Sequence, residues 1–147
     1  MDKSKVKIMV PTAADEDILY ELVCELELGP LDREKFAQVY QYNIKDPNIY
    51  YIKLLYESEV IGFGSVHIQK LLHHCYTPVG EVQELIVTKK YQGLGLGTLL
   101  MDRLKDIAAE NKCELLEVCC NRQREDSLKF YLRQGMDQSH YKFTLIM

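Results

Sequence analysis

The pattern of hydrophobic and polar positions along the chain predicts alternating strands and helices. Strand-like alternation or β-branched and aromatic runs cover residues 6–10, 51–56, 60–69, 81–87, 114–120 and 140–146. Helical spacing of apolar residues covers 14–28, 32–44, 96–108 and 125–133. The order is one strand, two helices, three strands, a helix, a strand, a helix and a strand. We therefore predict the α/β class, with a mixed central α+β sheet flanked by helices.

The chain has 147 residues and contains no repeat, low-complexity tract or linker-like segment. This length suits one hydrophobic core. We expect a single domain over residues 1–147.

Charge and composition exclude several classes of protein. The formal net charge is −4, which argues against a nucleic-acid surface. The apolar runs are shorter than the roughly 20 residues of a membrane-spanning helix, and the first residues lack the apolar core of a signal peptide. The five cysteines include no C-x-x-C pair. We expect a cytoplasmic protein with reduced thiols and no membrane partner.

Glycines are concentrated at one place. Three of the eight lie at Gly93, Gly95 and Gly97, between a predicted strand and a long predicted helix. Bare backbone at a helix N-terminus is suited to binding an anion such as phosphate. The Lys-Ser/Thr of a P-loop is missing after Gly97, and the spacing is not G-x-G-x-x-G. An ordinary tight turn is the alternative.

Two motifs decide between these interpretations. The segment 92–97 reads QGLGLG, and Asn121 is followed by SLKFYLRQGM at 127–136. Together they resemble the Q/R-x-x-G-x-G/A and N…A-x-x-F-Y-x-x-x-G-F/Y elements of the GCN5-related N-acetyltransferase (GNAT) superfamily. Ser127 and Met136 depart from that pattern. The order of predicted elements also resembles the GNAT fold.

The resemblance implies acetyl-CoA as co-substrate, with its pyrophosphate at the glycine loop. It implies backbone pairing of the pantetheine arm with the strand and a side-chain contact from Asn121. The implied cofactor-binding residues are Leu85, Ile86, Val87, Gln92, Gly93, Leu94, Gly95, Leu96, Gly97, Thr98 and Asn121.

Other segments resemble the aminoalkylphosphonate N-acetyltransferases. They read CEL at 24–26, DPN at 46–48, LHH at 72–74, GEVQEL at 80–85, FYLR at 130–133 and SH at 139–140. This resemblance implies a small primary amine as acceptor, an aminoalkylphosphonate by preference, which attacks acetyl-CoA directly in a ternary complex. A polyamine or another small amine is the alternative of the same class, and a non-catalytic acyl-CoA-binding module is the alternative of another class. Exposed strand edges would allow a homodimer.

Acetyl transfer needs a base for the protonated amine and a proton or dipole for the departing thiolate. By its position in the resemblance, Glu81 is the preferred base and Glu84 the rival. Strand alternation predicts them on opposite faces, and either is otherwise a solvated carboxylate. Tyr131 matches the tyrosine of the family that acts as general acid. A cysteine nucleophile, Cys119 or Cys120, is the covalent alternative.

The acceptor side offers His73 and His74 on a predicted loop as substrate-binding residues. A divalent metal bound by histidines would suit a phosphonate, but no metal-ligand spacing is met, so hydrogen-bonding histidines are the preferred interpretation. Arg122, Arg124 and Arg133 are alternative phosphonate contacts.

Overall fold

A computed structural model describes all residues, 1–147. The chain divides into two compact units, Met1–Glu117 and Val118–Met147. The first unit carries the sheet and its core, and each unit is described by itself below.

The sheet has five strands in the order β1-β2-β3-β4-β5. Their bounds are Val6–Met9 (β1), Ile49–Tyr56 (β2), Glu59–Gln69 (β3), Val79–Val87 (β4) and Leu115–Val118 (β5). The pairs β1–β2, β2–β3 and β3–β4 are antiparallel. The long hairpin of β3 and β4 therefore forms the centre of the sheet.

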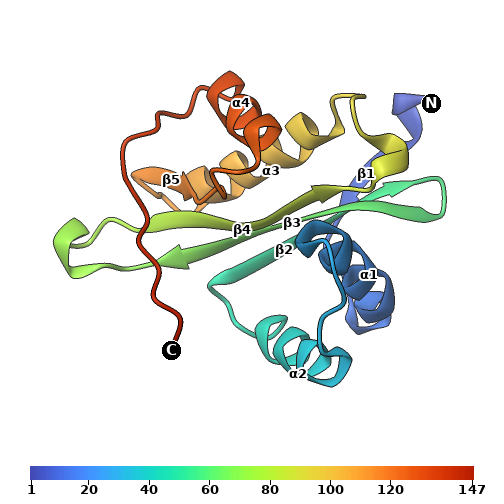
Figure 1. Ribbon diagram of the computed structural model, residues 1–147, viewed down its shortest axis with the longest axis horizontal. Helices are drawn as coiled ribbons and strands as arrows, with labels where there is room; N and C mark the ends of the chain where they lie inside the picture. Colours follow the sequence, from blue (N-terminus) through green and yellow to red (C-terminus); the bar gives the residue numbers. More distant parts are fainter. The chain divides into compact units, whose positions relative to one another are not determined.

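Helices cover both faces of this sheet (Figure 1). Helices α1 (Glu16–Glu27) and α2 (Arg33–Asn43) lie on one side, and α3 (Leu96–Glu110) lies on the other. Helix α1 ends at Glu27, and the left-handed conformation of Leu28 brings the Gly29 N–H to the Cys24 carbonyl at 3.1 Å. Helix α2 begins at Asp32, whose carboxylate accepts from the Lys35 N–H at 3.0 Å. In the second unit, helix α4 covers Glu125–Arg133.

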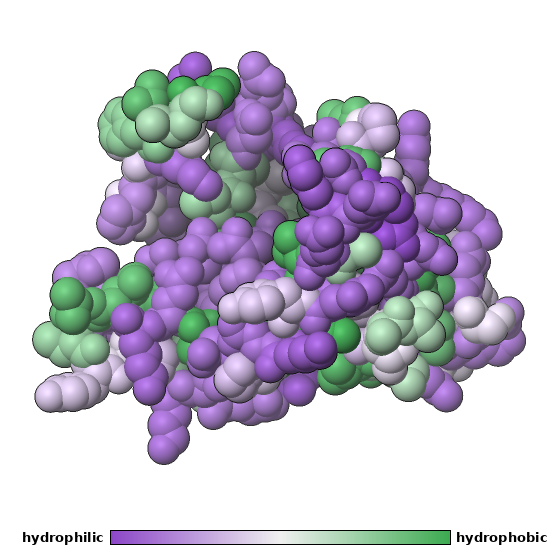
Figure 2. Space-filling view, turned by 90° about the horizontal axis from the view of Figure 1, so that it is seen from below, coloured by the Kyte–Doolittle hydropathy of each residue, from purple (hydrophilic) through white to green (hydrophobic).

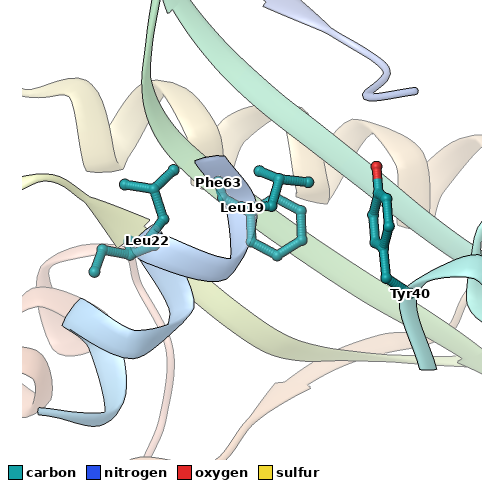
Figure 3. Packing of buried hydrophobic residues seen from close by; sticks show 5 residues of the cluster. Leu19, Leu22, Tyr40 and Phe63 are labelled. Atoms are coloured by element: carbon teal, nitrogen blue, oxygen red, sulfur yellow. The ribbon is translucent and has the colours of Figure 1, made fainter. Parts of the chain in front are cut away.

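The core on the α1–α2 side joins the helices to β3 and β4. Leu19 and Leu22 of α1 and Tyr40 of α2 form a buried cluster with Phe63 and Ile86 (Figure 3). On the α3 side, a side chain at Gly62 would come within 2.9 Å of the Ile86 carbonyl oxygen. Glycine at this position therefore lets the neighbouring strand and helix pack closely.

A partly buried ion pair connects the start of α1 to the sheet. The Lys53 ammonium lies 2.7 and 2.8 Å from the two carboxylate oxygens of Asp15, and both side chains are 13% exposed. Burial opposes the shift, but hydrogen bonds from Lys53 and Thr12 hold the pKa of Asp15 below its usual value.

On the α1–α2 side of the molecule, hydrophilic residues predominate and hydrophobic residues form separate patches (Figure 2). No helix in the structure is long and apolar enough to cross a membrane.

The predicted order of elements is confirmed except for the last strand. Residues 136–147 form no helix or strand, so the strand predicted over 140–146 is wrong. The side chains of Tyr141, Phe143 and Leu145, which carry the alternating pattern, are all more than four-fifths exposed. Alternation indicates a strand only where a neighbouring strand supplies hydrogen bonds and a face to bury.

Candidate functional site

A bulge interrupts the pairing of β3 with β4. Phe63 pairs with Ile86, whereas Val66 pairs with Val82, so one extra residue lies in β4. Gln83 is exposed within this stretch. The pairing of β3 with β2 has no irregularity over the same residues, which places the bulge in β4.

The bulge brings two carboxylates to one face of the sheet. Beyond it, Glu81 pairs with His67, which lies on the same face of β3 as Phe63 and therefore on the α1–α2 side. Glu84 also lies on this side. The expected separation of Glu81 and Glu84 onto opposite faces is wrong, because strict alternation has no place for the extra residue.

Ser65 holds Glu84 at the bulge. The Ser65 hydroxyl donates to Oε2 of Glu84, and its Oγ accepts from the Glu84 backbone N–H at 3.0 Å. Ser65 is 0% exposed. The carboxylate therefore has a defined position in β4.

The surroundings of Glu84 favour its neutral form. Burial raises the pKa of the Glu84 carboxyl above its ordinary value, and the negative charge of Glu27 adds to the rise. The Ser65 hydrogen bond and the charge of His67 oppose it. A carboxylate with a raised pKa is a better proton acceptor, as general-base catalysis near neutral pH requires.

Tyr51 lies beside this carboxylate. It pairs with Ser65 across β2 and β3, and its hydroxyl accepts from the side-chain amide of Asn43, the last residue of α2, at 2.8 Å. Burial raises the pKa of Tyr51, the Asn43 hydrogen bond opposes the rise, and the charge of Glu84 adds to it. The Tyr51 phenol is therefore neutral at neutral pH and is a polar group beside Glu84.

The glycine loop has the geometry that binding of an anion requires. Gly93 and Gly95 have φ values of 75° and 78°, which glycine adopts without the strain of a side chain. Gly95 is the N-cap of α3, and the first N–H groups of a helix have no partner within it. Backbone donors and the helix dipole thus converge where a phosphate group would fit.

Side chains fix this loop to the end of β4. The Gln92 side-chain amide donates to the Val87 carbonyl at 2.8 Å. Glu25 of α1 accepts from the Thr88 hydroxyl at 2.9 Å and from the Lys89 N–H at 2.7 Å. The Gln92 side chain thus connects the loop to the end of β4. The Val87 carbonyl is the acceptor of this hydrogen bond.

The other predicted cofactor-binding residues of this unit lie in β4, in the loop and in the first turn of α3. Leu85 and Ile86 are in β4, Gly97 is in the first turn of α3, and Leu94 is on the exposed part of the loop. The Leu96 side chain is 3% exposed in the core, so only its backbone is available to a ligand. Thr98, two residues further along α3, is exposed.

The second unit carries the predicted acid, Tyr131, on α4. Burial, followed by the nearby Cys120, raises the pKa of Tyr131 to about 12, against the opposing charge of Arg124. The phenol is therefore protonated at neutral pH and able to donate. The Asn121 side-chain oxygen accepts from the Gln123 N–H at 3.0 Å, which shapes the turn before α4.

Cys120 does not have the environment of a nucleophile. Burial raises the pKa of the Cys120 thiol, opposed by the charge of Arg124, whereas a nucleophilic thiol needs a lowered pKa. The adjacent Cys119 is exposed.

The two predicted acceptor histidines lie in the turn between β3 and β4. His73 is exposed, and Nδ1 of His74 contacts the Glu114 carboxylate. The residues between Val79, where β4 begins, and Glu84 separate this turn from the carboxylate. No group of three or more His, Cys, Asp or Glu side chains that could hold a metal comes together. The side chains present do not fit a metal site.

The sequence did not predict the residues around Glu84 or the hydrogen bonds that Glu25 accepts from Thr88 and Lys89. The missed residues are Glu25, Glu27, Asn43, Tyr51, Ser65 and His67. A hydroxyl between Gly64 and Val66 in an apolar strand is a local signal for Ser65. The partners from α1, α2 and β2 come together only through tertiary pairing.

Comparison with known proteins defines the class of this protein. A family model described as the Acetyltransferase (GNAT) family matches residues 16–136. The chain therefore belongs to the GNAT family and is an N-acetyltransferase, as the two sequence motifs predict. GNAT enzymes use acetyl-CoA, and the anion-binding geometry of the glycine loop fits the phosphates of that molecule.

The chain is also similar to individual acetyltransferases. The chain is 39% identical over 133 residues to an aminoalkylphosphonate N-acetyltransferase of Salmonella typhimurium, covering 90% of this chain and 86% of the relative. It is 27% identical over 126 residues to a glucosamine 6-phosphate N-acetyltransferase of Candida albicans, covering 84% and 83%. The structure of a glucosamine-6-phosphate N-acetyltransferase from Arabidopsis thaliana is similar with a TM-score of 0.80, at 17% identity, covering 96% of this chain and 97% of that one. This last likeness concerns the fold alone.

Proposed function

We propose that this enzyme transfers the acetyl group of acetyl-CoA to the primary amine of an aminoalkylphosphonate. The 39% identity to a relative of that name, over 90% of the chain, carries the proposal. The relatives named for glucosamine 6-phosphate have lower identity. Their substrate also joins a primary amine to a phosphorus oxyanion, so both groups of relatives support an amine of this class.

Acetylation of a polyamine is the second candidate, and one observation favours it. The α1–α2 side of the sheet presents Glu81 and Glu84, and Glu27 of α1 acts on Glu84 through its charge. Carboxylates of this kind attract a polycation more than a phosphonate dianion. A phosphonate would therefore need cationic contacts, for which Arg122, Arg124 and Arg133 of the second unit are candidates.

We assign the general base to Glu84, with Glu81 as the second carboxylate on the same face. The position of Glu81 in the resemblance to the family still supports Glu81 as a base. Burial, a raised pKa and the contact with Ser65 are observations on Glu84, and they favour it as the group that takes the proton of the ammonium.

The reaction is then a direct transfer. The amine loses its proton to Glu84, and its nitrogen forms a bond to the acetyl carbonyl carbon, which gives a tetrahedral oxyanion. As the oxyanion collapses, the bond from that carbon to sulfur breaks and the nitrogen loses its second proton to solvent. Tyr131 gives its proton to the coenzyme A thiolate and regains one from solvent, to which Glu84 releases its own. The oxyanion is stabilised by hydrogen-bond donors, and no covalent enzyme intermediate is needed.

The predicted cofactor-binding residues serve the same reaction. Backbone N–H groups of the loop and of the first turn of α3 would hold the pyrophosphate. Backbone groups of Leu85, Ile86 and Val87 would pair with the pantetheine amides like an added strand, and Asn121 would contact that arm. His73 and His74 stay proposed as hydrogen-bonding groups for the acceptor. Residues 1–147 would act as a single domain, and a homodimer stays a prediction.

The direct experiment measures thiol release from acetyl-CoA with a panel of amines. The panel contains aminomethylphosphonate, aminoethylphosphonate, glucosamine 6-phosphate, spermidine and an amino acid. We expect the highest kcat/KM with one of the aminophosphonates. Efficient turnover of spermidine without turnover of either aminophosphonate would overturn the substrate proposal in favour of the second candidate.

A further inference from the structure

Ser65 is the only polar residue of the chain that the fold buries in its core. It lies in β3 between Gly64 and Val66, opposite the bulge of β4. Burying a hydroxyl costs free energy unless it is hydrogen-bonded. A small apolar residue would fill the same space at lower cost, so a requirement for the hydroxyl has to come from its contacts.

Both contacts go to one residue. The hydroxyl donates to the Glu84 carboxylate, and its oxygen accepts from the Glu84 N–H at 3.0 Å. The extra residue of a bulge interrupts the ladder of backbone hydrogen bonds, and Ser65 supplies an acceptor there. Backbone and side chain of Glu84 are thus fixed by the same atom.

We propose that Ser65 is a positioning residue for acetyl transfer, whose hydroxyl holds the Glu84 carboxylate in one orientation and in its proton-accepting form. This inference rests on the proposed function, which assigns the base to Glu84. Ser65 acts through Glu84 and is not itself a catalytic residue.

Other groups also act on this carboxylate. His67 of β3 favours the charged form, while Glu27 of α1 disfavours it. Tyr51 of β2 interacts with Glu84 through charge, and Glu81 lies on the same face. Because a hydrogen bond to a carboxylate favours its ionised form, loss of the hydroxyl would leave burial and Glu27 opposed mainly by His67. The pKa of Glu84 should therefore rise further.

The test is the pH dependence of kcat/KM in Ser65→Ala, with aminoethylphosphonate, or spermidine if the phosphonates are not turned over. We expect the acidic limb of the profile to move to higher pH. Activity should fall about tenfold at mildly acidic pH, as for loss of a hydrogen bond to a charged group, and recover at alkaline pH. An equal loss at every pH, or no loss, would overturn the proposal.

Controls separate this proposal from the assignment of the base. Ser58→Ala removes an exposed serine in the turn between β2 and β3 and should leave the profile unchanged. A carbon-13 NMR titration of labelled glutamate, with Glu84→Gln to identify the signal, reports the same shift in Ser65→Ala without any substrate. Wild-type activity in Glu84→Gln overturns the assignment of the base, whereas an unmoved Glu84 titration overturns the role of Ser65 alone. If Ser65→Ala does not fold, Ser65→Cys, a weaker donor of similar shape, should move the titration in the same direction.

Discussion

Glu84 combines a cost to the stability of the fold with a proposed role in the chemistry. A carboxylate taken out of water loses solvation, and a second carboxylate, Glu27, adds repulsion. Stability alone would favour an uncharged residue at this position. Residues that destabilise the fold while serving a reaction are expected in active sites, which supports the role of Glu84 as the base.

The stability of Glu84→Gln should therefore depend on pH relative to the wild type. Because folding raises the pKa of Glu84, its contribution is fully present below the unfolded value of about 4.3 and is lost as pH rises through the folded value. The amide has no such titration. We expect the melting temperature of Glu84→Gln minus that of the wild type to increase from acidic to alkaline pH.

Thermal unfolding monitored by circular dichroism over a series of pH values measures this difference. Glu81→Gln is the matched isosteric control on the same strand. A difference for Glu84→Gln that stays constant with pH would contradict a raised pKa.

At this scale the sequence identified the carboxylates but not their arrangement. Glu81 and Glu84 stand out in the strand pattern, yet period-two alternation cannot show an extra residue, and the bulge is visible only in the pairing with β3. The contribution of Tyr51 and Glu27 arises from other elements that fold onto β4. Which residues are candidates for the chemistry could therefore be predicted from the sequence more readily than which residues surround them in the fold.

Among the elements, the glycine loop depends on helix α1. Glu25 accepts from the Thr88 hydroxyl and the Lys89 N–H, at the start of the segment that leads to the loop. This contact connects the helix that covers the sheet with the backbone that would hold the pyrophosphate. Ordering the loop before binding lowers the entropy cost of binding.

Glu25→Ala should consequently weaken coenzyme A binding. Loss of the acceptor leaves the Lys89 N–H without this partner, and we expect Kd to rise about threefold to tenfold, the larger value corresponding to one hydrogen bond to a charged group. Isothermal titration calorimetry measures the change. Glu21→Ala, an exposed glutamate on the same helix, is the control and should bind as the wild type does. An unchanged Kd in Glu25→Ala would show that the loop is ordered without the Glu25 hydrogen bonds.

The elements themselves were largely predictable, because their patterns are local. Four helices and five strands lie where apolar spacing places them, with ends shifted by a few residues. The exception is 140–146, whose alternation is strong but whose side chains are exposed and whose backbone is not in a sheet. A strand needs a partner, which the sequence pattern does not specify.

At the scale of the whole molecule, the proposed site residues are divided between the two units. The first, Met1–Glu117, carries the glycine loop, the bulge and both carboxylates, and the second, Val118–Met147, carries Asn121 and Tyr131. The family model spans 16–136 and so includes residues of both. The motifs that identify the family were present in the sequence, whereas the electrostatics that select a base required the folded sheet.

The assignment of the general base to Glu84 is tested by comparing kcat of Glu84→Gln with that of Glu81→Gln, using the amine of the panel that has the highest kcat/KM. Both variants are isosteric and lie on one strand. We predict a loss of roughly 10²–10⁴-fold for Glu84→Gln, as for removal of a general base, and a change within about threefold for Glu81→Gln. A large loss of kcat in Glu81→Gln with near-wild-type turnover in Glu84→Gln would contradict the assignment of the base to Glu84 and would favour Glu81 instead.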